Sequence, residues 1–215
     1  MGWRNDQVGE KETGEIIRIA RECLEIKGDF VEMGCYKGDT SLLLAEVLGK
    51  YNKNVEYFEE ENCENNRGGG CGKPVENFGK KRLWIYDSFE GLPEKTEADK
   101  SVLGEDFRRG ELFVTKRAVK ERFLRAGLPV PVIKKAWFAD LTEADLPEQI
   151  SFAFLDGDLY ESIRDCLRLV VPKMEPGGAI LVHDYRNPAL PGVKKAVDEV
   201  FSEVKTFESL AVIWV

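Results

Sequence analysis

Two patterns of hydrophobic and polar residues predict that helices and strands alternate along the chain. Within 13–26 the apolar residues recur every three or four positions, which is typical of an amphipathic helix. Other segments are short continuous apolar runs, which are typical of strands buried on both faces. The helices are expected at 13–26, 39–51, 115–128, 160–174 and 192–204, and the strands at 28–34, 82–89, 130–138, 150–156 and 177–184.

This alternation predicts an α/β fold of the Rossmann-like type, in which a mostly parallel sheet is covered by helices on both faces. The residues after Val204 leave too little chain for a helical crossover, so we expect a hairpin. The hairpin brings the sheet to seven strands and gives it one late antiparallel strand. A chain of this length is most simply one domain, 1–215. Segment 52–81 is rich in Asn, Glu and Gly, and we expect it to be a mobile insertion.

The composition is that of a soluble globular protein, with 43% hydrophobic and 33% charged residues. A formal net charge of -8 argues against nucleic acid or an anionic membrane as a partner, because both require a basic surface. No apolar run approaches the roughly 20 residues of a membrane span, and the polar, acidic start is unlike a signal peptide. We therefore expect a cytoplasmic protein with reduced thiols, and monomer and homo-oligomer both remain open.

The first predicted strand ends in a glycine-containing turn, EMGCYKGDTS. In an open α/β sheet, ligands bind beyond the carboxyl ends of the strands, which makes this turn a candidate ligand site. A dinucleotide-binding turn needs a glycine where this chain has Tyr36, whose side chain obstructs a pyrophosphate. The spacing E-x-G-x-x-x-G suits instead a cofactor without phosphates, whose amino-acid part and ribose lie along the turn. The predicted cofactor-binding residues of this turn are Glu32, Gly34, Tyr36, Gly38, Thr40 and Ser41.

Asp87 ends the second predicted strand. A carboxylate at that position can accept hydrogen bonds from both ribose hydroxyls of a nucleoside. It follows the glycine turn by more than the usual ~20 residues, and the expected insertion accounts for the excess. The alternative is that the two glycines only shape a tight turn and that Asp87 caps a loop. The occurrence of both features at consecutive strand ends favours cofactor binding.

Two aspartates, Asp156 and Asp158, follow the fourth predicted strand in the sequence FAFLDGDLYES. Asp158 stands three residues before Glu161 at the start of a helical pattern, so we expect it to be the N-cap of that helix. Asp156 is expected at the strand end, on the ligand side.

The next strand ends in His183, the only histidine of the chain, and Asp184. Neighbouring strand ends in a parallel sheet lie about 5 Å apart, so Asp156, His183 and Asp184 are expected to meet around one point. Crowded carboxylates repel one another unless a cation or a proton lies between them. Carboxylates suit Mg²⁺, whereas an imidazole also admits Mn²⁺, Fe²⁺ or Zn²⁺. A metal ligand, a general base and a structural histidine are the alternatives for His183.

Four stretches resemble the macrocin O-methyltransferase family: VEMGCYKGDTS, IYDSFEGLP, FLDGDLYESIRDCLRLVVPKMEPGGAILVHDY and PGVKKAVDEVF. They run in the family's order from about residue 28 to 201, and LDGDLYES beside GGAILVHDY is the specific part. The resemblance implies a class I methyltransferase fold, S-adenosylmethionine as methyl donor and a divalent metal, Mg²⁺ or Mn²⁺. The family usually has an aspartate at the position of His183.

The resemblance also implies roles for individual residues. Glu32, Gly34 and Gly38 form the methionine and ribose cradle. Asp156, His183 and Asp184 hold the metal. If no metal binds, we expect His183 or Asp156 to be the general base, which makes these two the candidate catalytic residues. The remaining cofactor-binding positions are Asp87 with Ser88 and Phe89 nearby, and Ala136, Trp137 and Asp140 beside the adenine.

The implied activity is methyl transfer to a hydroxyl of a small-molecule acceptor, either a sugar or a phenol. One alternative is a non-catalytic S-adenosylmethionine-binding protein with a decayed metal site. A nicotinamide oxidoreductase is a weaker alternative because of Tyr36.

Overall fold

The computed structural model describes residues 7–64, 79–103 and 107–215, with side chains described outside 56–64. The helices are α1 Glu10–Glu22, α2 Asp39–Glu64, α3 Lys116–Ala126, α4 Tyr160–Val170 and α5 Pro191–Asp198. The strands are β1 Asp29–Met33, β2 Leu83–Asp87, β3 Val132–Lys135, β4 Ile150–Leu155, β5 Met174–Val182, β6 Lys205–Phe207 and β7 Leu210–Trp214. None of the helices in the described part combines the length and the apolar character needed to cross a membrane.

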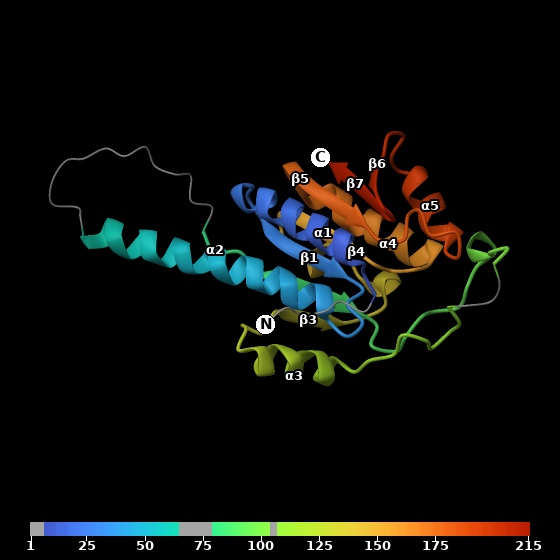
Figure 1. Ribbon diagram of the computed structural model, residues 1–215, viewed down its shortest axis with the longest axis horizontal. Coiled ribbons are helices and arrows are strands. Elements are labelled where there is room, and N and C mark those ends of the chain that lie inside the picture. The colour runs from blue at the N-terminus through green and yellow to red at the C-terminus, as the bar shows by residue number, and fades with distance from the viewer. Residues whose placement is uncertain (1–6, 65–78, 104–106) are drawn as a thin grey trace.

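The strands form one seven-stranded sheet in the order β3-β2-β1-β4-β5-β7-β6 (Figure 1). The first five strands are parallel, and β7 runs antiparallel to both β5 and β6. The predicted fold class and the closing hairpin are therefore confirmed. The order reverses between β1 and β4, and α/β sheets bind ligands at such a reversal.

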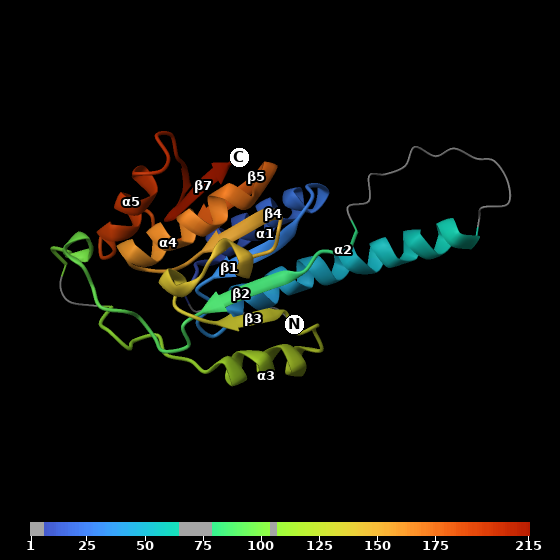
Figure 2. The same ribbon diagram turned by 180° about the vertical axis from the view of Figure 1, so that it is seen from behind.

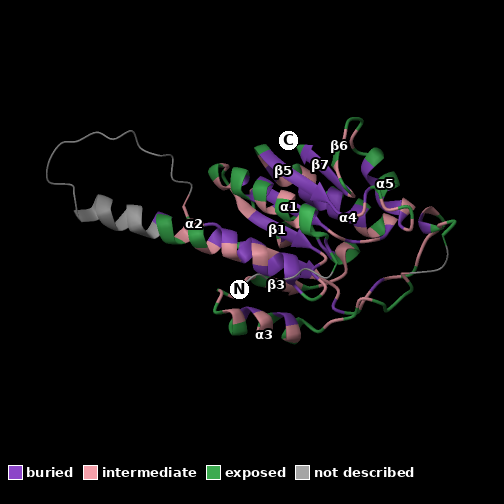
Figure 3. Cartoon of the chain, in the orientation of Figure 1, coloured by how far each residue is buried: buried purple, intermediate pink, exposed green. Residues whose placement is uncertain are grey.

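Helices cover both faces of the sheet, and each face has its own apolar core. The helices α1, α2 and α3 lie on one face, and α4 and α5 lie on the other, as the reversed view of Figure 2 shows. Along β4, Phe152 and Phe154 pack on the first face, and Ala153 and Leu155 pack on the second. Every residue of β4 is buried, which explains its continuous apolar sequence (Figure 3).

Helix α2 is longer than the sequence pattern predicts. It continues past Tyr51 to Glu64, so the first part of the expected insertion is helical, and 65–78 lie outside the described residues. The sequence predicts a helix end at Tyr51, because residues 52–81 are rich in Asn, Glu and Gly. The side-chain amide of Asn52 pairs with the backbone of Lys81, donating to the carbonyl at 2.8 Å and accepting from the N–H at 2.9 Å.

Candidate active site

A cavity of about 350 Å³ opens at the carboxyl ends of the parallel strands. Strand registers bring these ends to one level, since Met33 of β1 pairs with Leu155 of β4, which in turn pairs with Val182 of β5. A smaller cavity of about 20 Å³ adjoins it at the glycine turn. The predicted site residues that line the large cavity are Gly34, Tyr36, Asp87, Ser88, Ala136, Trp137, Asp156, His183 and Asp184. Those that line the small one are Glu32, Gly34, Tyr36, Thr40 and Asp156.

Four predicted site residues line neither cavity. Phe89 is buried in the apolar core on the α1 face, and Asp140 is exposed in a turn after β3. Ser41 is fully buried and donates a hydrogen bond to Glu32. Gly38 has a positive φ of 82°, and an added Cβ would lie 3.2 Å from Val119. Gly38 therefore shapes the turn, and Ser41 orients the buried side chain of Glu32.

Gly34 is a residue that the site geometry requires. Its φ is +88°, and an added Cβ would lie 2.0 Å from the carbonyl oxygen of Asp156. Hydrogen bonds from Gly34 N to Tyr86 O (2.9 Å) and from Asp156 N to Met33 O (2.8 Å) hold the strand ends in this close approach. Only glycine fits there without a shift of backbone.

Asp87 fixes the glycine turn to the end of β2. Its Oδ2 accepts the N–H groups of Cys35 at 2.9 Å and Tyr36 at 3.3 Å, and its Oδ1 accepts that of Phe89 at 2.7 Å. A carboxylate has about four acceptor positions, so capacity remains on the side that lines the cavity. An apolar wall made by Trp137, Phe138 and Leu92 lies across the same cavity and suits a planar ring.

Four non-glycine residues just beyond the strand ends have positive φ angles. They are Tyr36 (42°) after β1, Phe89 (51°) after β2, Asp158 (59°) after β4 and Asp184 (59°) after β5. A left-handed conformation costs such residues roughly 1–2 kcal/mol each, and residues of this kind cluster at functional sites. Strain at four neighbouring strand ends marks this edge of the sheet as the functional one.

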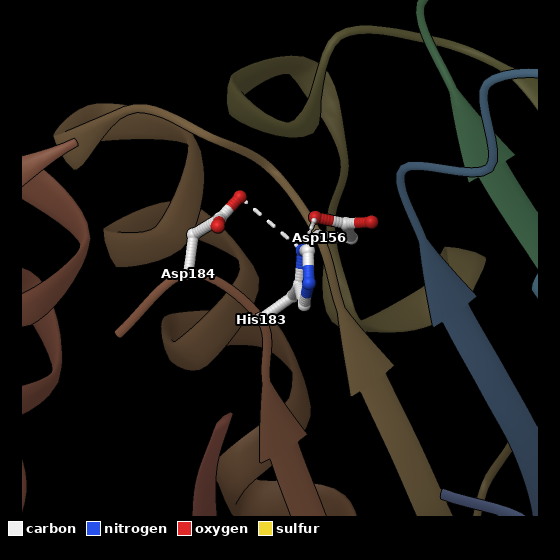
Figure 4. A group of neighbouring side chains, drawn as sticks. All are labelled: Asp156, His183 and Asp184. Atoms are coloured by element: carbon white, nitrogen blue, oxygen red, sulfur yellow. Dashed lines mark hydrogen bonds and ion pairs between the residues drawn. The ribbon is translucent and has the colours of Figure 1, made fainter. Parts of the chain in front are cut away.

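The imidazole of His183 lies between two carboxylates (Figure 4). Its Nδ1 is 3.0 Å from Asp156 Oδ1 and 3.2 Å from Asp184 Oδ2. Burial lowers the pKa of His183, but Asp156, Asp184 and Glu12 outweigh it and hold that pKa well above its usual value. In the absence of a metal, the cation between the crowded carboxylates is therefore the histidine itself.

The same three residues also fit a divalent metal. Their ligand atoms all lie within 4.8 Å of one another, and no other group of this kind occurs among the described residues. Two oxygens and one imidazole nitrogen form a donor set that several divalent ions accept. The structure thus brings Asp156, His183 and Asp184 together, as the sequence predicts.

Glu12 is a residue of the site that sequence reasoning missed. It belongs to α1, is 8% exposed, and its Oε2 lies 3.7 Å from His183 Nε2. The contact with His183 lowers the pKa of Glu12 to about 2, against the opposing effect of burial. One signal was available, because Glu12 falls on the helix face that also carries the buried Ile16 and Ile19. A charged residue at a core position calls for a buried partner.

The expected role of Asp158 as a helix cap is wrong. The N-cap of α4 is Leu159, without a side-chain cap, and the Tyr160 N–H donates to Asp99 Oδ1 at 2.7 Å. The backbone of Asp158 has a left-handed conformation, and the residue lines the large cavity. Its side chain forms no hydrogen bond with residues that the structure describes. Burial raises its pKa well above the usual value, and the charges of Asp156 and Asp184 add to the shift.

Comparisons with known proteins agree with this architecture. The family model of the macrocin O-methyltransferases (TylF) matches residues 71–213, which include Asp87, Asp156, His183 and Asp184. The 8-demethyl-8-(2,3-dimethoxy-alpha-L-rhamnosyl)-tetracenomycin-C 4'-O-methyltransferase of Streptomyces olivaceus is 29% identical over 166 residues, 74% of this chain. The demethyldecarbamoylnovobiocin O-methyltransferase of Streptomyces niveus is 26% identical over 211 residues, 90% of this chain. The chain spans 54% of the first relative and 70% of the second.

Solved structures show the same fold. The O-methyltransferase NovP superposes with a TM-score of 0.74 at 24% identity, over 96% of this chain and 80% of NovP. The calicheamicin methyltransferase CalS11 gives 0.71 at 17% identity, over 99% and 80%. An O-methyltransferase from Bacillus cereus in complex with SAH gives 0.52 at 13% identity, over 98% of this chain and 81% of that structure. The fold is that of class I methyltransferases, and because the family model matches well over half of its residues, the chain belongs to the macrocin O-methyltransferase family.

Proposed function

We propose that this chain transfers a methyl group from S-adenosylmethionine to a hydroxyl of a neutral small molecule, a sugar or a phenol. One observation carries the proposal: a single cavity is lined both by Gly34 and Asp87 and by the cluster of Asp156, His183 and Asp184. A cofactor held by the first group would therefore lie beside an acceptor held by the second. Two relatives are named as O-methyltransferases, one of a rhamnosyl-tetracenomycin and the other of demethyldecarbamoylnovobiocin.

The residues around the glycine turn fit S-adenosylmethionine. Asp87 has about one acceptor position left for a ribose hydroxyl, and Trp137 and Phe138 offer an apolar wall for adenine. The buried Glu32 lines the small cavity, where its carboxylate suits the ammonium of the methionine part. When bound, the cofactor supplies a methyl group that is already activated by the sulfonium. The task of this chain is then to align the acceptor and to remove its proton.

We assign a divalent metal to Asp156, His183 and Asp184 on the basis of their donor set and spacing. Bound there, the ion would supply a Lewis acid that lowers the pKa of a coordinated hydroxyl. The three side chains follow the carboxyl ends of the adjacent strands β4 and β5, whose last five residues are all buried, so their backbone positions are rigid. They would orient the acceptor oxygen toward the cofactor side of the cavity.

We assign proton removal to Asp158. Asp156 and His183, the two residues that the sequence suggests as general base, are paired with each other at 3.0 Å. The carboxylate of Asp158 lines the same cavity and forms no hydrogen bond within the described part of the chain. Burial and its acidic neighbours favour the protonated form of Asp158, and the positive charges of the sulfonium and the metal would favour its carboxylate once both are bound. In that form it would accept the hydroxyl proton while the new O–C bond forms and the C–S bond breaks, leaving the electron pair of that bond on sulfur.

The charge of the cavity supports a neutral acceptor. Its lining includes the carboxylates of Asp158, Glu161 and Asp165 in addition to those already assigned. No lysine or arginine is among the described lining residues. Apart from His183 and the metal assigned to its cluster, a phosphorylated or carboxylated acceptor would meet only carboxylates among the charged lining residues and would be repelled by them. An acceptor sugar is thus expected as a glycoside rather than as a nucleotide sugar.

One observation favours a second candidate, a non-catalytic protein that binds S-adenosylmethionine. The imidazolium of His183 already offsets part of the negative charge of Asp156 and Asp184, so the cluster holds a cation even without a metal. Calorimetry with S-adenosylhomocysteine and Mn²⁺, together with a methyl-transfer assay on glycosides and phenols, separates the two. The enzyme binds both ligands and turns over, whereas the binding protein takes up S-adenosylhomocysteine alone. Absence of S-adenosylhomocysteine binding contradicts both candidates.

A further inference from the structure

His183 contacts carboxylates through both of its ring nitrogens. Nδ1 faces Asp156 and Asp184, as Figure 4 shows, and Nε2 faces Glu12 Oε2 at 3.7 Å. Asp156 and Asp184 follow strands of the central sheet, whereas Glu12 comes from the first turn of α1. His183 and Glu12 are 6% and 8% exposed. A buried carboxylate from a separate element thus lies behind the imidazole, on the side away from the strand-end aspartates.

Glu12 is held in place by its own hydrogen bonds. Its Oε1 accepts from the N–H of Ser209 at 2.8 Å and from the hydroxyl of Ser209 at 2.6 Å. Its Oε2 accepts from the N–H of Gly9 at 3.2 Å. Within the described residues, His183 is the sole cationic side chain that contacts this carboxylate. The three donors fix the orientation of the Glu12 carboxylate, and His183 is the cation that faces its negative charge.

This arrangement suits an imidazole that binds a metal through Nδ1. A ring that binds a metal through one nitrogen keeps a hydrogen only on the other, and that other nitrogen, Nε2, faces the carboxylate of Glu12, which can only accept. Nδ1 is the nitrogen directed at Asp156 and Asp184. Histidines that bind metals commonly donate their second N–H to a carboxylate in this way.

We propose that Glu12 is a positioning residue that directs Nδ1 of His183 into the cluster as a ligand, and that the cluster consequently prefers a divalent transition ion to Mg²⁺. The inference rests on the metal assignment of the proposed function and deepens it. Carboxylates bind Mg²⁺ and transition ions alike, whereas a correctly oriented imidazole favours ions such as Co²⁺, Fe²⁺ and Zn²⁺. The preference therefore depends on His183 and on what orients it.

Replacement of Glu12 by glutamine tests the orientation without removing volume. The two shorter hydrogen bonds from Ser209 outweigh the single longer one from Gly9 and keep the amide oxygen on the Ser209 side, so the NH₂ group faces Nε2 of His183. The ring then accepts through Nε2 and carries its hydrogen on Nδ1, where it blocks the metal. Glu12→Ala leaves the ring orientation unset. A merely structural role predicts that alanine does more harm than glutamine, and the positioning role predicts that glutamine is at least as harmful to metal binding.

The experiment is calorimetry of the metal-free full chain with Co²⁺ and Mg²⁺, together with the visible absorption spectrum of bound Co²⁺. We expect Co²⁺ to bind more tightly than Mg²⁺, and Glu12→Gln to lose about tenfold or more in Co²⁺ affinity and to change the spectrum. His183→Asp is expected to shift the preference toward Mg²⁺. Glu15→Gln is the matched control, because Glu15 lies on the same helix and its carboxylate bonds to Arg18.

Retained Co²⁺ affinity and an unchanged spectrum in Glu12→Gln would overturn the inference. So would a wild-type chain that binds no divalent ion or prefers Mg²⁺. Thermal unfolding without metal shows that each variant is folded. Binding of S-adenosylhomocysteine is measured in parallel. If the metal experiment fails but the cofactor still binds and an acceptor is methylated, the inference about Glu12 is wrong and the proposed function stands.

Discussion

Asp99 caps helix α4 from 61 residues away, with its Oδ1 accepting the N–H of Tyr160 at 2.7 Å. Its Oδ2 also accepts the N–H and the hydroxyl of Thr96, at 2.9 and 2.8 Å. The site is closely packed, since an added Cβ on Gly192 would lie 2.0 Å from Asp99 Oδ1. The loop after β2 is therefore joined to the two helices on the α4 face.

We expect Asp99→Ala to lower the free energy of unfolding by about 2 kcal/mol, because it removes a buried cap and leaves donors unpaired. Urea unfolding measures the change. Asp158→Asn is the matched control, since Asp158 makes no cap. Equal destabilisation by both substitutions would show that the long-range cap contributes little.

Asp158→Asn should instead abolish most of the activity. If its carboxylate removes the acceptor proton, the amide variant is expected to lose about 10²–10⁴-fold in kcat with little change in KM for S-adenosylmethionine. Stability at neutral pH should not fall, because burial and two neighbouring carboxylates disfavour the charge of Asp158. A variant with full turnover would assign the proton removal elsewhere.

Gly34→Ala is expected to destabilise the protein by more than about 2 kcal/mol, and to weaken binding of S-adenosylhomocysteine. The new methyl group would lie 2.0 Å from backbone at a φ of +88°. Gly14→Ala in α1 is the control, because nothing lies within 4 Å of its added Cβ. That substitution should stabilise by about 0.5–1 kcal/mol. Thermal or urea unfolding of the pair gives the comparison, and a neutral Gly34→Ala would be incompatible with the strand-end geometry.

Glu32 predicts a pH dependence of stability. Burial raises its pKa from 4.5 to about 8, against the hydrogen bond from Ser41, which lowers it. Between these values the folded state binds more protons than the unfolded state, so the free energy of unfolding contributed by Glu32 falls as pH rises. Glutamine does not ionise, so the Glu32→Gln variant should not lose this stability as pH rises. We expect similar melting temperatures at pH 5 and, at pH 8, a variant more stable by on the order of 5 °C.

The same Glu32→Gln variant should bind S-adenosylhomocysteine more weakly, because glutamine cannot take on the negative charge that Glu32 would acquire when the ammonium of the methionine part binds beside it. Scanning calorimetry at the two pH values and binding calorimetry are the two measurements. A difference in melting temperature that is equal at both pH values would contradict the protonated state of Glu32.

The sequence predicts best those features that local pattern and the geometry of parallel sheets determine. Apolar runs identified the strands, and the common edge of parallel strands brought Asp156 and His183 together. What it missed depends on contacts between distant residues. Lys81 pairs with Asn52 and so permits a longer helix, and Asp99 replaces Asp158 as the cap. No local pattern contains these partners.

The central claim is that the cofactor and the metal share one cavity. The most direct test is an NMR titration. S-adenosylmethionine labelled with ¹³C in its methyl group is bound to the chain, and its methyl signal is followed as Mn²⁺ is added. We predict strong paramagnetic broadening of the bound methyl signal in the wild type, and none in Asp156→Asn combined with Asp184→Asn. A bound methyl signal that stays sharp in the wild type at saturating Mn²⁺ would contradict the account.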